Sequence, residues 1–188
     1  ADGIRVPAET VVSAIGVLPD VALAERAGLA TANGIVTDAF LRTSDPHIFA
    51  AGDCAAVSQP EGGTTRFESW RNARSQAETA ARNMTGAHEA FCAPQWFWSD
   101  QYDLSLQVTG LPQSGHQSIL RSIAEGELEF YLEDGLLVAA AGLGTGNGVA
   151  RDIKLVEMLI AAGITPDQSA LADPAVNLKG LLKSARAA

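Results

Sequence analysis

The chain has 188 residues, of which 47% are hydrophobic and 19% charged, and its formal net charge is −9. This length and composition are typical of a folded protein with one or two small domains, and they exclude an intrinsically disordered chain. The negative charge argues against a nucleic-acid partner, because neutralising phosphates requires a basic surface. No apolar stretch approaches the ~20 residues that span a bilayer, so we expect no membrane segment.

The two cysteines, Cys54 and Cys92, lie far apart, and no Cys or His residues cluster at the spacing of a metal site. We therefore expect a reducing, cytoplasmic setting and no bound metal. The chain opens on "ADGIRVPAET", which lacks the basic leader and apolar core of a signal peptide. Because it has no initiating Met and enters a strand-like run at once, we expect it to be part of a longer protein.

The first elements predict an α/β arrangement. Residues 10–20, "TVVSAIGVLPD", form a β-branched apolar run closed by Pro19 and Asp20, which predicts a buried strand followed by a turn. Residues 21–31 have Ala and Leu at helical spacing and predict one or two short helical turns. Asn33 and Gly34 predict a tight turn between short extended pieces.

A second buried strand is predicted over residues 47–51, which show no alternation of polar and apolar side chains. Residues 56–66 then predict a polar loop. A helix follows from Glu68 to roughly Thr85, with Gly86 ending it. Its apolar side chains recur at helical spacing and predict one buried stripe made of Trp70, Ala73, Ala77, Ala80, Ala81 and Met84.

The remaining residues predict an antiparallel sheet with helices. Residues 104–108 alternate as a half-buried strand does, and residues 128–141 predict a hairpin on Asp134-Gly135. An amphipathic helix is predicted to end at Gly163, with short helices near residues 165–171 and 177–186. The fold class is therefore α/β up to about residue 92, followed by a separate α+β unit over residues 93–188.

Gly52 and Asp53 follow the strand predicted over residues 47–51. In open α/β sheets, ligands bind beyond the carboxyl ends of the strands. A glycine there lets the backbone approach a ligand closely, and a carboxylate accepts hydrogen bonds from sugar or polyol hydroxyls. The alternative is that Asp53 only caps the following segment.

The Gly-rich segment 142–152, "GLGTGNGVARD", invites comparison with phosphate-binding loops. Asn147 stands where the dinucleotide fingerprint requires its third Gly, and no acidic residue follows a second parallel strand. We therefore favour a loop leading into a helix. Four arginines on or before the long helix predict either a basic strip that steers an acidic partner or an ordinary solvated face: Arg66, Arg71, Arg74 and Arg82.

The segment "TSDPHIFAAGDCA", residues 43–55, resembles the second FAD signature of the pyridine-nucleotide-dependent flavin reductases. Together with "VVSAIGVLPDVALAERAGL", "GIVTDAFLRTSDP", "RFESWRNARSQAETAARNMTG" and "WFWSDQYDLSLQVTGL", it resembles the ferredoxin and rubredoxin reductases that serve oxygenase systems. The resemblance implies that residues 1–92 comprise the end of the NAD domain and the second segment of a partial FAD-binding domain. It implies that residues 93–188 are the reductase C-terminal domain.

The resemblance also implies roles for individual residues. Asp53, after Gly52, would bind a hydroxyl of the FAD ribityl chain. Ser69 and Trp70 begin the long helix, with Trp70 against the flavin ring, and Trp98 would border the isoalloxazine from the C-terminal domain. The alternatives are that Trp70 is a core aromatic and that Trp98 serves interdomain packing.

The implied function is electron transfer from NAD(P)H through FAD to a ferredoxin or rubredoxin, with no acid–base or covalent catalyst in this segment. Neither Gly-rich dinucleotide fingerprint is present, so we expect the isolated chain to be inactive. One alternative is a binding or homodimerisation module without catalysis. Another is a flavoprotein of the apoptosis-inducing-factor type, although that branch typically has His where Ser69 and Trp70 stand.

Overall fold

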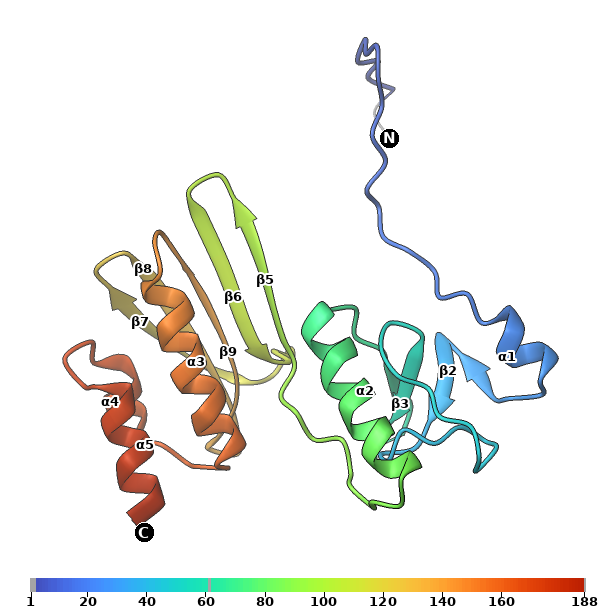
Figure 1. Ribbon diagram of the computed structural model, residues 1–188. Helices are drawn as coiled ribbons and strands as arrows, with labels where there is room; N and C mark the ends of the chain where they lie inside the picture. Colours follow the sequence, from blue (N-terminus) through green and yellow to red (C-terminus); the bar gives the residue numbers. More distant parts are fainter. Residues whose placement is uncertain (1–2, 61, 188) are drawn as a thin grey trace.

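The computed structural model describes residues 3–60 and 62–187 and arranges them around two separate sheets (Figure 1). The first sheet, with helices α1 and α2, forms the N-terminal lobe. The second sheet, with helices α3 to α5, forms the C-terminal lobe. A segment without regular structure, between α2 and the first strand of the second sheet, joins the lobes. The α/β unit followed by an antiparallel sheet with helices confirms the predicted fold class.

The N-terminal lobe is built on four short strands. They are β1 (Thr31–Ala32), β2 (Gly34–Thr37), β3 (Ala55–Ser58) and β4 (Thr64–Thr65), in the spatial order β1-β2-β3-β4. Strands β2 and β3 run parallel, and the outer pairs are antiparallel. The short helix α1 (Ala22–Arg26) and the tight turn at Asn33 are as predicted.

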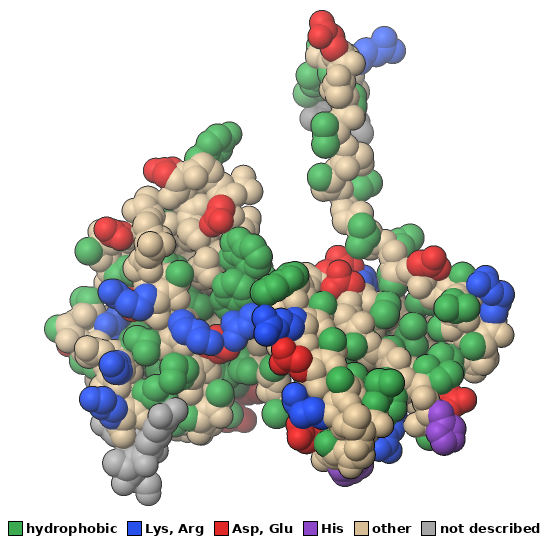
Figure 2. All heavy atoms as spheres, in the orientation of Figure 1, with side chains coloured by type: hydrophobic (Ala, Val, Ile, Leu, Met, Phe, Trp, Pro, Cys, Tyr) green, Lys and Arg blue, Asp and Glu red, His purple; other side chains and the backbone are tan. Residues whose placement is uncertain are grey.

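Residues 10–20 are not the predicted strand. They belong to an extended arm that stands clear of both lobes, and Ile15 in this arm is 93% exposed (Figures 1 and 2). No strand in the described part of the chain lies beside this arm to pair with it. Without such a partner its backbone N–H and C=O groups bond to water, and its β-branched side chains have no face to pack on.

The strand predicted over residues 47–51 is also wrong, because only an isolated bridge between Arg42 and Phe49 forms there. Side chains of nearby residues form hydrogen bonds with the local backbone groups instead. Asp45 Oδ1 accepts from the His47 N–H at 2.8 Å, and Thr43 Oγ1 donates to the Ile48 carbonyl at 3.0 Å. Such local bonds compete with strand pairing. The strand lies further along, in β3, where part of a polar loop was predicted.

Helix α2 (Trp70–Met84) forms where predicted, but most of its predicted apolar stripe is exposed or only partly buried. Trp70 is 69% exposed and Met84 66% exposed. The buried positions are mostly polar: Asn72, Gln76, Thr79, Ala80 and Asn83. Of the predicted buried stripe only Ala80 is buried, where it packs with Leu41 and Val57, because most of the inner face of α2 makes hydrogen bonds to loop backbone.

Asn83 illustrates this inner face. Its amide Nδ2 donates to the carbonyls of Phe40 and Glu89, both at 2.9 Å, and its Oδ1 accepts from the Glu89 N–H at 2.9 Å. A buried amide that satisfies three backbone groups replaces the packing that an apolar side chain would supply.

The C-terminal lobe contains a five-stranded antiparallel sheet in the order β5-β6-β9-β8-β7. Its strands are β5 (Trp96–Gln101), β6 (Leu104–Gly110), β7 (Gln117–Ile123), β8 (Gly126–Glu133) and β9 (Leu136–Gly144). Strand β7 was not among the predicted elements. The predicted hairpin on Asp134-Gly135 joins β8 to β9, and both turn residues have positive φ, at 49° and 83°. This conformation suits a two-residue turn of type I′.

Three helices complete this lobe as predicted: α3 (Gly148–Ala161), α4 (Gln168–Ala172) and α5 (Leu178–Ala187). Helix α3 lies across the sheet (Figure 1) and buries Ile153 and Val156 against Leu128 and Phe130 of β8. None of the helices in the described ranges has the length and hydrophobicity of a membrane-spanning segment.

The Gly-rich segment between β9 and α3 serves close packing. A Cβ on Gly142 would lie 2.6 Å from Val149 Cγ1 and 2.7 Å from Leu128 Cδ2, both in the core. Near the start of α3, a Cβ on Gly146 would lie 3.0 Å from a carboxylate oxygen of Glu125. A negative side chain at this helix start disfavours a bound phosphate, which agrees with the loop-into-helix interpretation.

We predict that Gly142→Ala lowers the free energy of unfolding of this chain by about 1–3 kcal/mol, because the added methyl overpacks the α3–sheet contact. Urea unfolding measures the effect. Gly148→Ala, in the same segment, is the control: its Cβ would meet only a Glu125 oxygen at 3.6 Å. The control should change stability by less than about 1 kcal/mol. Equal effects of the two changes would contradict the packing role of Gly142.

Candidate functional site

The loop of Gly52 and Asp53 precedes β3 rather than following a strand. Two side chains hold its backbone. Gln76 Oε1, on the buried face of α2, accepts from the Gly52 N–H at 2.7 Å, and Arg66 Nη1 donates to the Asp53 carbonyl at 3.0 Å. The loop is thus fixed from both sides before any ligand binds.

Glycine is required at position 52 for two reasons. Its φ is 84°, in the left-handed region, and a Cβ there would lie 3.3 Å from Ala73 Cβ on α2. The close approach lets the loop lie directly against the first turns of the helix. This places Asp53 near the start of α2.

The Asp53 side chain is exposed, and within the described ranges its carboxylate has no hydrogen-bond or ion-pair partner. The capping alternative is wrong, because a strand follows Asp53 and its carboxylate accepts from no backbone N–H. A carboxylate offers only acceptor oxygens, and these fit the hydroxyls of a polyol. An unpaired carboxylate on a loop held in place therefore suits the ribityl chain that the resemblance implies.

Ser69 and Trp70 begin α2. The Ser69 hydroxyl accepts from the Asn72 N–H at 3.1 Å and so caps the helix. Trp70 occupies the first helical position with its indole exposed, so the alternative that it is a core aromatic is wrong. The arrangement presents a flat, exposed ring at the start of the helix, where negative charge is favoured.

Trp98 comes from the other lobe, on β5, and is 46% exposed. It stacks on Trp96, with ring centroids 5.2 Å apart and planes inclined by 27°. Trp96 in turn packs against the core of the C-terminal lobe. The exposed indole of Trp98 is therefore stacked on the partly buried indole of Trp96.

Arg71, next to Trp70, reaches the C-terminal lobe. Its guanidinium pairs with both carboxylate oxygens of Glu157 on α3, with Nη1 at 3.0 Å from Oε2, and it lies over the Trp96 ring at 5.3 Å. Phe67 and Phe97 add an aromatic contact, with centroids 6.0 Å apart. These contacts join the start of α2 to β5.

The four arginines of the predicted basic strip are each paired with a carboxylate. The pairs are Arg66–Glu68, Arg71–Glu157, Arg74–Glu78 and Arg82–Glu89. Their charges are largely compensated within the chain, which disfavours a strip that steers acidic partners.

Several residues that shape the site were not predicted as site residues. Gln76, Arg66 and Glu157 act through partners 13 to 86 positions away in the sequence. The one available signal was the presence of Asn72, Gln76 and Asn83 at helical spacing. These three amides mark the side of the helix that is buried, whereas burial was expected for the apolar stripe.

Glu157 has a perturbed acidity. Burial pushes its pKa upward, but hydrogen bonds from Arg71 and Lys154, with their positive charges, outweigh burial and hold the pKa below its ordinary value of 4.5. The carboxylate therefore remains ionised between the two cations at neutral pH.

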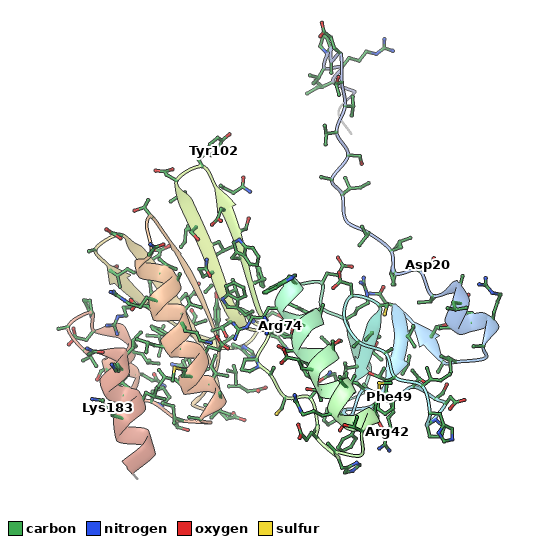
Figure 3. All side chains as sticks on the ribbon, in the orientation of Figure 1. Asp20, Arg42, Phe49, Arg74, Tyr102 and Lys183 are labelled. Carbon is green, nitrogen blue, oxygen red and sulfur yellow. The ribbon has the colours of Figure 1, made fainter. Side chains whose placement is uncertain are left out.

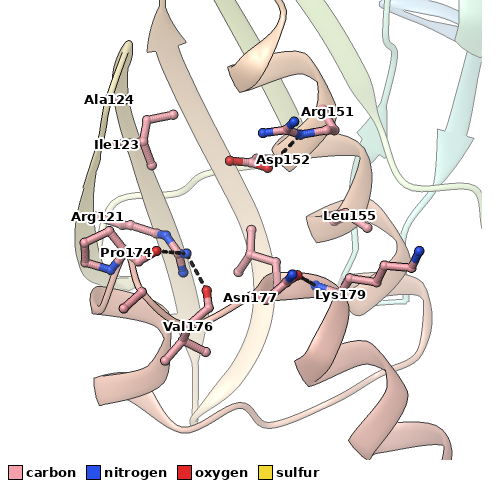
Figure 4. Close-up of a pocket in the computed structure, with 12 residues that line it drawn as sticks. Arg121, Ile123, Ala124, Arg151, Asp152, Leu155, Pro174, Val176, Asn177 and Lys179 are labelled. Carbon is pink, nitrogen blue, oxygen red and sulfur yellow. Dashed lines mark hydrogen bonds and ion pairs between the residues drawn. The ribbon is translucent and has the colours of Figure 1, made fainter.

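The hollow shown in Figure 4, of about 590 Å³, lies in the C-terminal lobe between β7, α3 and the start of α5. Arg121 in its wall is buried and donates to the backbone carbonyls of Pro174 and Val176. This arginine therefore holds the connection between α4 and α5. Among the described residues, no cluster of His, Cys, Asp and Glu could hold a metal ion.

We predict that Gln76→Leu lowers the free energy of unfolding by about 1–3 kcal/mol, because it leaves the buried Gly52 N–H without an acceptor. Urea unfolding of the chain measures this. Glu78→Gln, two residues along α2, removes only an exposed ion pair with Arg74 and should cost roughly 0.3–0.5 kcal/mol. A Gln76→Leu variant as stable as this control would show that the amide does not hold the loop.

The acidity of Glu157 predicts a pH dependence. Because its folded pKa is depressed, the ionised carboxylate stabilises the fold above pH 4.5, and this contribution is lost as the pH falls through the folded pKa. The difference in unfolding free energy between the native chain and Glu157→Gln should therefore shrink as the pH falls below 4.5. Denaturant unfolding at a series of pH values measures it, with Glu78→Gln as the exposed control. A difference that does not change with pH would contradict the assignment.

Comparison with known proteins gives matches over nearly the whole chain. Residues 1–77 match the pyridine nucleotide-disulphide oxidoreductase family, and residues 96–182 match the reductase C-terminal family. A curated relative, the ferredoxin–NAD(+) reductase component of the anthranilate 1,2-dioxygenase system of Burkholderia cepacia, is 45% identical over 181 residues. The match covers 94% of this chain and 44% of the relative.

Solved structures agree with these matches. The ferredoxin reductase for the CYP199A2 system from Rhodopseudomonas palustris has a TM-score of 0.84 and 36% identity, covering 96% of this chain and 44% of that one. Putidaredoxin reductase, in its covalent complex with putidaredoxin, has a TM-score of 0.83 and 32% identity, covering 100% and 45%. The chain thus spans less than half the length of these relatives. Its two matched segments are thus similar to the pyridine nucleotide-disulphide oxidoreductase and reductase C-terminal families, and the chain as a whole is similar to part of a ferredoxin reductase.

Proposed function

We propose that this chain supplies one side of an FAD site in a reductase that passes electrons from NAD(P)H to a ferredoxin- or rubredoxin-type acceptor. The observation that carries the proposal is the exposed, unpaired carboxylate of Asp53 on a loop held by Gln76 and Arg66. The backbone of this loop is held in place, and the Asp53 carboxylate remains available to a ligand. The reductase names of the relatives support the acceptor class.

In this proposal the Asp53 carboxylate accepts a hydrogen bond from a hydroxyl of the FAD ribityl chain. Gly52 lets the loop approach the cofactor, and its N–H bond to Gln76 keeps the loop from moving when the ligand binds. A charge-assisted hydrogen bond of this kind is worth about 1.5–3 kcal/mol. Asp53 therefore orients the cofactor and takes no part in proton transfer.

Trp70 and Trp98 border the flavin ring from the two lobes and exclude water from it. Ser69 fixes the first turn of α2, so that Trp70 and the backbone N–H groups of the helix start keep their places. When bound, the flavin supplies hydride acceptance and single-electron transfer. The chain itself contributes binding, orientation and exclusion of water.

The two lobes correspond in this proposal to two domains, residues 1–92 and 93–188. The first completes the FAD-binding domain, and the second is the C-terminal domain that carries Trp98. Because neither dinucleotide fingerprint is present in the chain, we infer that it has no reductase activity alone. Both cysteines are free thiols, which supports a cytoplasmic setting.

A second candidate function is a binding or homodimerisation module without catalysis. The exposed arm and the outward-facing apolar side chains of α2, including Trp70 and Met84, favour it, because exposed apolar surface tends to be covered by a partner. The same surfaces also suit contact with the parts of a reductase that this chain does not contain. The apoptosis-inducing-factor alternative is disfavoured by Ser69 and Trp70, because that branch typically has His at these positions.

We predict that Asp53→Ala weakens FAD binding by about 10- to 100-fold, the value of one charge-assisted hydrogen bond. The assay uses a chimera in which this chain replaces the matching 181 residues of the Burkholderia cepacia relative. Visible absorbance of the purified protein gives the flavin retained, and titration of the apoprotein gives the dissociation constant.

Asp103→Ala is the control, because it removes the same charge from the tip of the β5–β6 hairpin, beside Tyr102 (Figure 3). It should leave FAD binding unchanged. The chain alone should give no NADH-dependent reduction of an artificial acceptor, whereas the chimera should. Equal FAD affinity of the Asp53→Ala and Asp103→Ala chimeras would overturn the proposed role of Asp53.

A further inference from the structure

We propose that Arg71 is a positioning residue. It holds the stacked Trp96–Trp98 pair of the C-terminal lobe in a fixed position relative to the start of α2. The role in the FAD site rests on the function proposed above, but the positioning itself is a property of this chain. Arg71 directly follows Trp70, so whatever fixes Arg71 also fixes the backbone that carries Trp70.

The first half of the contact is a two-pronged ion pair. Both terminal nitrogens of the Arg71 guanidinium bind the two carboxylate oxygens of Glu157, one on each. A planar fork facing a planar carboxylate fixes both the distance and the orientation of the two groups. The Glu157 side chain is 9% exposed and that of Arg71 is 33% exposed, so solvent and salt screen the pair only in part.

Glu157 is itself anchored. It lies in the middle of α3, and Lys154 Nζ, one turn earlier, donates to its Oε2 at 3.0 Å. Helix α3 packs its buried face on the sheet that carries Trp96 and Trp98. Arg71 is therefore tied to a rigid part of the C-terminal lobe.

The second half of the contact is with Trp96. The Arg71 guanidinium carbon lies 5.3 Å from the centroid of the Trp96 ring, within the range of a cation–π interaction. Trp96 stacks on Trp98 at 5.2 Å. One guanidinium thus contacts both an acid on α3 and the inner ring of the stacked pair.

Few other side-chain contacts cross between the lobes near this point. The Phe67–Phe97 pair is an aromatic contact with ring centroids 6.0 Å apart. Such a contact constrains orientation less strictly than the two-pronged Arg71–Glu157 ion pair does. Arg74, one turn along α2, pairs instead with Glu78 of its own helix. Helix α2 therefore offers a second arginine, paired within its own helix, that can serve as a matched control.

The test uses the 188-residue chain without FAD and compares Arg71→Met and Arg71→Lys with Arg74→Met. Near-ultraviolet circular dichroism reports the stacked Trp96–Trp98 pair, and the indole N–H signals in NMR report each tryptophan separately. Arg71→Met should reduce the tryptophan dichroism by about half or more and shift the signals of Trp96 and Trp98. Far-ultraviolet dichroism should remain unchanged, because the sheets keep their own cores.

Arg71→Lys should fail to restore the tryptophan signals, because an ammonium group has no fork with which to bind both oxygens. Arg74→Met should match the native chain. If Arg71→Met unfolds the chain, Arg71→Lys and Glu157→Gln decide the question, since both retain most of the packing.

Native tryptophan signals in the Arg71→Lys and Glu157→Gln variants would overturn the positioning role. The measurement involves no flavin. A failure of FAD binding by the chimera would count against the proposed function and leave this result intact.

Discussion

The contact of Arg71 with Glu157 and Trp96 is the constraint on which the arrangement of the two lobes depends. The candidate site draws Asp53 and Trp70 from the N-terminal lobe and Trp98 from the C-terminal lobe. Neither sheet crosses from one lobe to the other, and the segment between them has no regular structure. A directional ion pair at the start of α2 therefore sets where the aromatic side chains of one lobe stand relative to the other.

Within the N-terminal lobe, helix α2 buries a mostly polar face and exposes apolar side chains on its outer face. The inner face carries amides that hold loops: Gln76 holds the Gly52 loop, and Asn83 holds the segments of Phe40 and Glu89. The outer face carries apolar side chains, and the N-terminal arm is apolar and exposed as well. In the proposed reductase, these surfaces would contact the parts that this chain does not contain.

The sequence predicted best those elements whose signals are local. The Asp134-Gly135 hairpin and the C-terminal ends of α2 and α3 follow from turn residues and terminal glycines. The strand over residues 10–20 failed because β-branched composition predicts a strand only where a neighbouring strand exists. The buried stripe of α2 failed because periodicity identifies two faces of a helix without stating which one the rest of the chain covers.

The same limit applies to the site. The motif placed Asp53 and the two tryptophans by resemblance, and their roles toward FAD stay proposals. The residues that hold them, Gln76 and the Arg71–Glu157 pair, act across 24 and 86 positions in the sequence. No local pattern connects such partners, because their proximity is a product of the folded lobes. Only Gly52, with its left-handed backbone next to an acidic residue, carried a local sign of its role.

The central claim is that the unpaired Asp53 carboxylate binds the polyol arm of the cofactor while indoles from both lobes border its ring. A crystal structure of the FAD-loaded chimera tests this most directly. The account predicts an Asp53 carboxylate oxygen within hydrogen-bonding distance of a ribityl hydroxyl, with Trp70 and Trp98 beside the isoalloxazine. An FAD bound in the chimera with Asp53 directed into solvent and the ribityl chain held by other groups would contradict it.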